Sequence, residues 1–100
     1  MSLHIQKSIG EPVMMSLSGR LDTTTASDLE ASLADVLANA KALVLDLAGL
    51  EYISSAGLRV ILKAQKTMCV RNGMKLVHVP EAVLEVFDIT GFSDFLTIEK

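Results

Sequence analysis

A short apolar segment in the middle of the chain, residues 42–48 with the sequence ALVLDLA, constrains the fold more than any other feature. It is far shorter than the roughly 20 residues that cross a bilayer as a helix. Short, nearly continuous apolar runs are typical of a β-strand that is covered on both faces. The apolar residues on either side of this run follow helical spacing. We therefore predict a central parallel strand between two helices.

Two further strands are predicted before the first helix. Residues 3–9 alternate apolar and polar side chains, which is the pattern of a half-buried strand. A turn at residues 10–12 follows, and residues 13–19 continue as a second strand. The short connection predicts that these two strands pair antiparallel.

Three segments have the 3.6-residue spacing of amphipathic helices, namely residues 23–40, 55–71 and 80–90. One of the threonines at positions 23–25 is expected to cap the first helix. Asn72 and Gly73 are expected to end the second, and Gly91 the third. Strands are predicted after the second and third helices, at residues 74–79 and 95–99.

The predicted order of elements is ββαβαβαβ, an α/β fold with a mixed β-sheet whose central parallel strands are covered by helices. Right-handed crossovers between consecutive parallel strands place their helices on one face of the sheet. Residues 1–100 have the length of a single domain, and half of them are hydrophobic, which is enough for a substantial core.

Charge and composition exclude several classes of function. The net charge of −3 argues against nucleic-acid binding, which needs a clustered basic surface. The first ten residues lack the apolar stretch of a signal peptide, so we expect a soluble cytoplasmic protein without membrane insertion. Cys69 is the single cysteine, so no internal disulfide can form. Its apolar surroundings predict a buried core thiol.

Signals for catalysis are weak. The two histidines, His4 and His78, lie in predicted strands far apart in the sequence. The neighbourhood of Ser55 reads S-S-A-G, which is not the G-x-S-x-G turn of hydrolases. The sequence has no metal-ligand spacing and no glycine-rich phosphate loop. We therefore predict no catalytic residue, no metal and no cofactor of its own.

Two carboxylates follow or end predicted strands. Asp46 is expected near the carboxyl end of a parallel strand, where open α/β sheets place their binding sites. Asp22 lies between a strand and a helix. Capping of a neighbouring loop or helix explains both residues without any function.

Ser54 and Ser55 stand where the central strand gives way to the second helix. One of them is expected to be the N-cap, which is worth about 1 kcal/mol to the helix. The same position also tolerates a phosphate, because a helix N-terminus carries free N–H groups and partial positive charge. The two interpretations are compatible, and the pattern alone does not separate the two hydroxyls.

Residues 43–62, LVLDLAGLEYISSAGLRVIL, resemble the signature of the STAS domain as found in bacterial anti-sigma factor antagonists. The parts that match in order and spacing are Asp46-Leu47, Tyr52-Ile53 and the segment SSAGL at 54–58. Residues 17–22 (LSGRLD) resemble the end of the family's second strand, and residues 83–92 (VLEVFDITGF) its third helix and the following turn. The resemblance thus spans nearly the whole chain.

The resemblance implies a phosphorylation switch. In this family the serine two places before the glycine, here Ser55, is phosphorylated by a cognate anti-sigma factor that is itself a serine kinase. The unphosphorylated form binds the kinase, the phosphorylated form releases it, and a PP2C-type phosphatase resets the cycle. ATP belongs to the kinase partner. Ser54 stands where the family often has Asp, and it is a secondary candidate for the phosphate.

The resemblance also implies a partner-binding edge, and it raises the question of a C-terminal helix that family members commonly have. The edge comprises Asp22, Thr23, Ser54, Ser55, Ala56 and Gly57, with Arg59 and Lys63 as polar contacts. The family's further C-terminal helix has no room after the last predicted strand, so we expect it to be absent or truncated in this chain.

Two alternative functions stay open. One is a STAS module that serves another assembly: control of secretion or motility, a stressosome-like scaffold, or a lipid-transport subunit. The other is a small enzyme or nucleotide-binding protein that uses Asp46 together with the helix N-terminus at Ser55.

Overall fold

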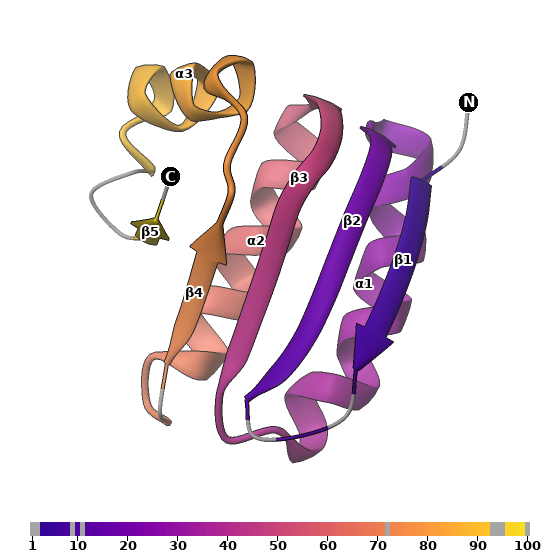
Figure 1. Ribbon diagram of the computed structural model, residues 1–100, viewed down its shortest axis with the longest axis vertical. Coiled ribbons are helices and arrows are strands. Elements are labelled where there is room, and N and C mark those ends of the chain that lie inside the picture. Colours follow the sequence, from indigo (N-terminus) through magenta and orange to yellow (C-terminus); the bar gives the residue numbers. More distant parts are fainter. Residues whose placement is uncertain (1–2, 9, 11, 72, 93–95, 100) are drawn as a thin grey trace.

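The computed structural model describes residues 3–8, 10, 12–71, 73–92 and 96–99, which form a five-stranded sheet and three helices (Figure 1). The strands are β1 (Leu3–Ser8), β2 (Val13–Leu21), β3 (Leu43–Ile53), β4 (Met74–Val77) and β5 (Thr97–Glu99). The helices are α1 (Thr23–Asn39), α2 (Ser55–Met68) and α3 (Glu81–Thr90). This is the predicted ββαβαβαβ order.

The strands lie in the sheet in the order β1-β2-β3-β4-β5. β1 pairs antiparallel with β2, and all other neighbours are parallel. The predicted mixed sheet with a parallel centre is therefore confirmed. The parallel strands start at the same edge of the sheet, and the carboxyl ends of β2 and β3 lie together at the top of Figure 1, whereas the shorter β4 ends beside Asp46 of β3.

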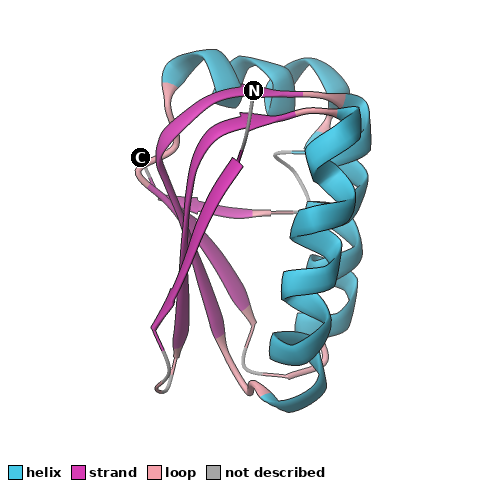
Figure 2. Cartoon of the chain, turned by 90° about the vertical axis from the view of Figure 1, so that its right-hand side faces the viewer, coloured by secondary structure: helices cyan, strands magenta, loops and turns pink. Residues whose placement is uncertain are grey.

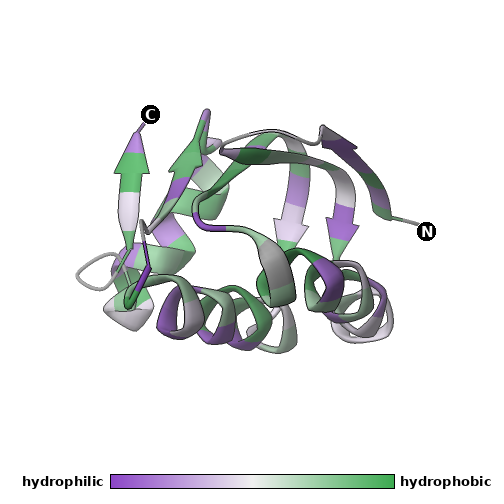
Figure 3. Ribbon diagram, turned by 90° about the horizontal axis from the view of Figure 1, so that it is seen from below, coloured by the Kyte–Doolittle hydropathy of each residue, from purple (hydrophilic) through white to green (hydrophobic). Residues whose placement is uncertain are grey.

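The molecule has two layers. Helices α1 and α2 pack against one face of the sheet, whereas α3 lies across the carboxyl ends of the strands (Figure 2). The same two layers are seen from below in Figure 3. The core lies between the sheet and the helices. Its largest fully buried side chains are Phe87, Met15, Leu17, Leu21, Leu29, Leu33, Leu43, Leu45, Leu47, Ile61, Met68 and Leu76.

The central strand is covered on one face, so the prediction that both faces are covered was wrong. Leu43, Leu45 and Leu47 are buried in the core. Val44 and Asp46 alternate with them and are half-buried on the opposite face. The run looked continuous because Val44, on the open face, is also apolar.

Strand β3 is longer than the predicted 42–48 and extends to Ile53. Its parallel pairing with β2 continues as far as Leu21↔Ile53, through two register shifts. Asp46 therefore lies in the first half of the strand and not at its carboxyl end, so that placement was wrong. Strand β4 is shorter than predicted, and His78 follows it with a positive φ of 53°.

Helix α2 ends at Met68 and not at residue 71, so Cys69 is the C-cap. Cys69 is exposed, which overturns the prediction of a buried thiol. The buried positions Leu58, Ile61, Ala64 and Met68 follow one stripe of the helix, and Cys69 falls beside that stripe. Asn72 and Phe95, which the sequence placed at a helix end and a strand start, lie outside the described residues.

No helix within the described ranges is both long enough and apolar enough to span a membrane.

Candidate functional site

Two helix starts lie side by side at the carboxyl edge of the sheet. β2 ends at Leu21 and leads through Asp22 into α1, and β3 ends at Ile53 and leads through Ser54 into α2. Leu21 and Ile53 are paired in register, and the Ser54 N–H donates to the Leu21 carbonyl at 2.8 Å. The sheet therefore brings the predicted residues of both segments to one edge.

Asp22 is the N-cap of α1. Its Oδ1 accepts the backbone N–H groups of Thr24 and Thr25, each at 3.0 Å. The Thr25 hydroxyl accepts the Asp22 N–H at 2.9 Å and donates to the Arg20 carbonyl at 2.8 Å, which completes a reciprocal capping box. The prediction that a threonine caps this helix was wrong, because the aspartate supplies the cap and Thr25 supports it.

These contacts lower the pKa of the Asp22 carboxyl below its ordinary value. The main cause is the hydrogen bond from the Thr25 N–H, and the Thr25 hydroxyl, the Thr24 N–H and the nearby Arg20 charge act in the same direction. All of them favour the ionised carboxylate. Asp22 is therefore a charged, fixed group beside the start of α1.

The structure separates the two serines. Ser54 is the N-cap of α2, and its hydroxyl accepts the Gly57 N–H at 3.3 Å. Ser55 is the first helical residue, and it is exposed. Within the described part of the chain, no hydrogen bond involves its hydroxyl. The cap and the free hydroxyl therefore belong to different residues.

Gly57 sets how closely α2 approaches the sheet. A Cβ atom at this position would lie 2.5 Å from Leu21 Cγ and 3.2 Å from Ile53 Cγ1. The next residue, Leu58, is 4 % exposed. The first turn of α2 is thus fixed to the ends of β2 and β3, and Ser55 has a fixed place on the surface.

The remaining predicted contact residues differ in what they are free to do. Thr23 and Arg59 are exposed, whereas Ala56 is partly buried and packs on the core. Lys63 is also exposed, but its Nζ forms an ion pair with Glu30 Oε2 on α1 at 3.0 Å. Lys63 is therefore held by its own chain, whereas Arg59 forms no such ion pair with any residue that the structure describes.

Sequence reasoning missed one pair at this edge. The Arg20 guanidinium carbon lies 4.3 Å from the centre of the Tyr52 ring, within cation–π distance. The two residues are register partners on β2 and β3, and Tyr52 is 41 % exposed. Each residue lies two positions before the N-cap of a helix. These equivalent positions on neighbouring parallel strands were the sequence signal that could have predicted the contact.

Asp46 does not belong to this edge. It lies seven positions before Ile53, which at about 3.3 Å per residue is more than roughly 20 Å of strand. Its Oδ1 accepts the Ala48 N–H at 3.0 Å and lies 3.2 Å from His78 Nδ1. The local capping interpretation therefore explains it. Among the described residues, no group of His, Cys, Asp and Glu side chains is arranged to hold a metal ion.

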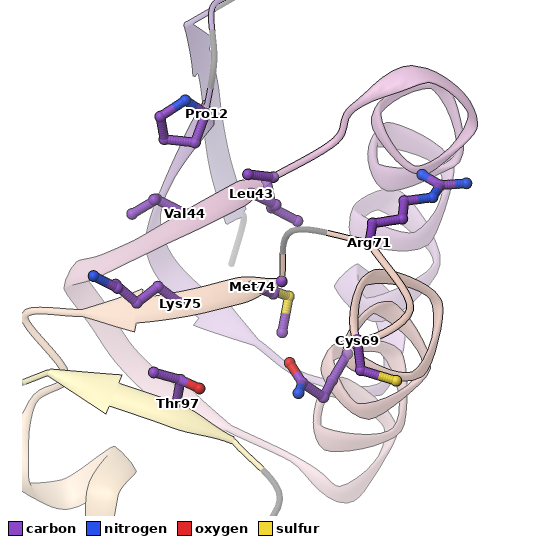
Figure 4. Close-up of a pocket in the computed structure, with 11 residues that line it drawn as sticks. Pro12, Leu43, Val44, Cys69, Arg71, Met74, Lys75 and Thr97 are labelled. Atoms are coloured by element: carbon purple, nitrogen blue, oxygen red, sulfur yellow. The ribbon is translucent and has the colours of Figure 1, made fainter.

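A hollow of about 480 Å³ lies at the opposite edge of the sheet (Figure 4). It is lined by residues near the starts of the parallel strands, such as Pro12, Leu43 and Met74, and by Cys69 and Arg71 after α2. None of the predicted partner-binding residues lines it. The hollow and the two helix starts are therefore separate features of the molecule.

Comparison with known proteins identifies the family. A family model described as "Mlab, STAS domain" matches residues 5–98. The chain belongs to the STAS domain family. This STAS domain is 44 % identical over 78 residues to BtrV of Bordetella bronchiseptica, a candidate anti-sigma factor antagonist. The aligned part is 76 % of this chain and 67 % of BtrV. It is 39 % identical over 49 residues to the anti-sigma-F factor antagonist RsfB of Mycobacterium tuberculosis, or 48 % of the chain and 40 % of RsfB.

Solved structures share the fold of this STAS domain. An anti-sigma factor antagonist from Mycobacterium paratuberculosis superposes with a TM-score of 0.89 at 24 % identity, covering 97 % of the chain and 85 % of that structure. The antagonist SpoIIAA in its unphosphorylated form superposes with a TM-score of 0.80 at 17 % identity, covering 97 % of the chain and 89 % of that structure. The sequence-based assignment to the STAS family, anti-sigma factor antagonist type, is therefore confirmed.

Proposed function

We propose that this STAS domain is an anti-sigma factor antagonist in the cytoplasm, switched by phosphorylation of Ser55. In its unphosphorylated form it binds an anti-sigma factor that is also a serine kinase. The kinase transfers the γ-phosphoryl group of its own bound ATP to the Ser55 hydroxyl, releasing ADP, and the complex dissociates. A PP2C-type phosphatase hydrolyses the phosphoserine and restores binding. The domain is then a binding module and a substrate, not an enzyme.

The observation that carries this proposal is the division of roles between the two serines. The Ser54 hydroxyl accepts the Gly57 N–H, and the exposed Ser55 hydroxyl has no partner among the described residues. A phosphoryl group on Ser55 leaves the α2 cap intact. It also lies at the positive end of the helix dipole, which favours a negative charge.

The relatives support the same function. RsfB is named as an anti-sigma-F factor antagonist, and BtrV as a candidate anti-sigma factor antagonist. SpoIIAA has been solved in an unphosphorylated and in a phosphorylated form, and this chain superposes on them with TM-scores of 0.80 and 0.74. SpoIIAA therefore has the same overall fold in both forms, which supports a switch that leaves the fold intact.

The energy that such a switch requires is modest. A 100-fold loss of affinity corresponds to about 2.8 kcal/mol. A phosphate adds about −1.5 to −2 charges at pH 7 to this exposed edge. Repulsion from a partner carboxylate and desolvation of the phosphate at the interface are sufficient to supply this difference.

The test is an intact-mass measurement of the protein incubated with its kinase partner and ATP. We expect the mass of one phosphoryl group to be added, and to be removed again by a PP2C-type phosphatase. Ser55→Ala should abolish the addition, and Ser54→Ala is the matched control that should retain it. Undiminished phosphorylation of Ser55→Ala would overturn the proposal.

A further inference from the structure

Ser55 and Arg59 lie one helical turn apart on the exposed side of α2. In a helix, residues at i and i+4 are surface neighbours, with about 5–6 Å between their Cβ atoms. Helical side chains also lean toward the N-terminus of the helix. The long Arg59 side chain is therefore within reach of any group attached to the Ser55 oxygen.

Arg59 is available for such a contact. Over the ranges that the structure describes, it forms no ion pair and its guanidinium donates no hydrogen bond. The next basic residue along the same side of the helix, Lys63, differs in this respect because Glu30 holds it at 3.0 Å. Of the two basic residues that the sequence suggested as contacts, the structure leaves Arg59 uncommitted.

We propose that the guanidinium of Arg59 binds the phosphate of phosphorylated Ser55 within the same chain. This inference rests on the phosphorylation proposed above, and it adds which side chain of the domain binds the phosphate. A guanidinium presents two parallel N–H donors that match two phosphate oxygens. An anion four residues before a cation is the favoured order in a helix, since it agrees with the helix dipole.

The pairing changes the exposed surface in two ways at once. Phosphorylation adds negative charge at Ser55, and the ion pair also withdraws the positive charge of Arg59 from the surface. A partner whose acidic group contacts Arg59 in the unphosphorylated state therefore loses that contact and gains a repulsion. The switch needs no movement of the backbone.

The experiment uses the full chain with phosphoserine encoded at position 55, so that no kinase is required. The second pKa of the phosphate is measured by ³¹P NMR titration. We expect it to be lower in this protein than in its Arg59→Gln variant by about 0.3 of a unit, as for other surface pairs at this spacing. Arg59→Lys should restore part of the difference, because it keeps the charge.

Lys63→Gln is the matched control, because it removes one positive charge from the same side of α2 at a position already paired with Glu30. Its phosphate should titrate as in the unsubstituted phosphoprotein. Equal phosphate pKa values with and without Arg59 would overturn the proposal. An equal rise of this pKa in Lys63→Gln would also overturn it, because the effect would then come from the overall positive charge of the helix and not from a contact with Arg59. The result is independent of whether any kinase phosphorylates Ser55, so the two proposals fail separately.

Discussion

The guanidinium of Arg20 stacks on the ring of Tyr52, 4.3 Å from its centre, where β2 and β3 approach the two helix caps. The pair is held by register, since the two residues are partners on neighbouring parallel strands. Arg and Tyr are among the side chains that are enriched in the energetic centres of protein interfaces, together with Trp. In this stacked pair, Arg20 lies two residues before Asp22, and Tyr52 lies three residues before Ser55.

We expect Tyr52→Ala to weaken binding to the proposed partner, a serine-kinase anti-sigma factor, by about tenfold or more, as for loss of an interface anchor. Stability should change little, because the ring is 41 % exposed and its contact with Arg20 is worth only about 0.5–1 kcal/mol. Titration calorimetry and thermal unfolding measure the two effects. Ile89→Ala is the control, because Ile89 is 84 % exposed on α3. An affinity unchanged by Tyr52→Ala would exclude the ring from the interface.

Ser54→Ala should lower the free energy of unfolding by about 1 kcal/mol, because it removes the hydroxyl that caps α2. Ser55→Ala should change it by less than about 0.5 kcal/mol, since its hydroxyl is exposed. Urea unfolding of the two variants compares them directly. A larger loss in Ser55→Ala than in Ser54→Ala would contradict the assignment of the cap.

Gly57→Ala should destabilise the protein by about 1–3 kcal/mol, even though alanine favours helices. The added methyl group would meet Leu21 at 2.5 Å, so the start of α2 would have to move away from the sheet. Gly10→Ala is the control, because its nearest contact would be an ordinary 3.7 Å. Equal unfolding free energies for the two variants would show that the close approach is unimportant.

Asp22→Ala should lower the Tm at pH 7, and this deficit should shrink in acid. The pKa of Asp22 is lowered in the folded state, so its ionised form stabilises the protein above the ordinary value of 3.8. That contribution is lost as the pH falls below 3.8 through the folded-state pKa. Thermal unfolding from pH 7 to pH 2.5 follows it, and a deficit that stays constant would contradict the role of the charge.

Cys69 should react with a thiol reagent in the native protein, because it is exposed at the end of α2. We expect its rate to lie within about tenfold of the rate in the urea-unfolded chain, since an accessible thiol needs no opening of the structure. Mass spectrometry after timed alkylation gives both rates. Protection by several orders of magnitude would restore the original prediction of a core residue.

The order of elements could be predicted because each segment carries its own period. The apolar residues of α1 and α2 recur at helical spacing, and β3 reads as a short apolar run. The length of β3 could not be predicted, because Gly49 and the charged Glu51 interrupt the apolar run after residue 48. Their strand conformation depends on pairing with β2, which is a long-range contact.

The candidate site was predictable as a region and not in its internal roles. The spacing placed both serines at a helix start, but only the geometry assigns the cap to Ser54 and leaves Ser55 free. Likewise, Arg59 and Lys63 look equivalent in the sequence. The ion pair to Glu30, a residue of another helix, is what distinguishes them. Such distinctions depend on tertiary contacts, which periodicity does not report.

The hydrogen bond from the Ser54 N–H to the Leu21 carbonyl joins the two helix starts across neighbouring strands. A partner that docks on both segments meets a surface already ordered in the free protein. Ordering this surface therefore adds little to the conformational entropy that is lost on binding. On a surface ordered in this way, the partner exchange proposed above requires no refolding of the domain.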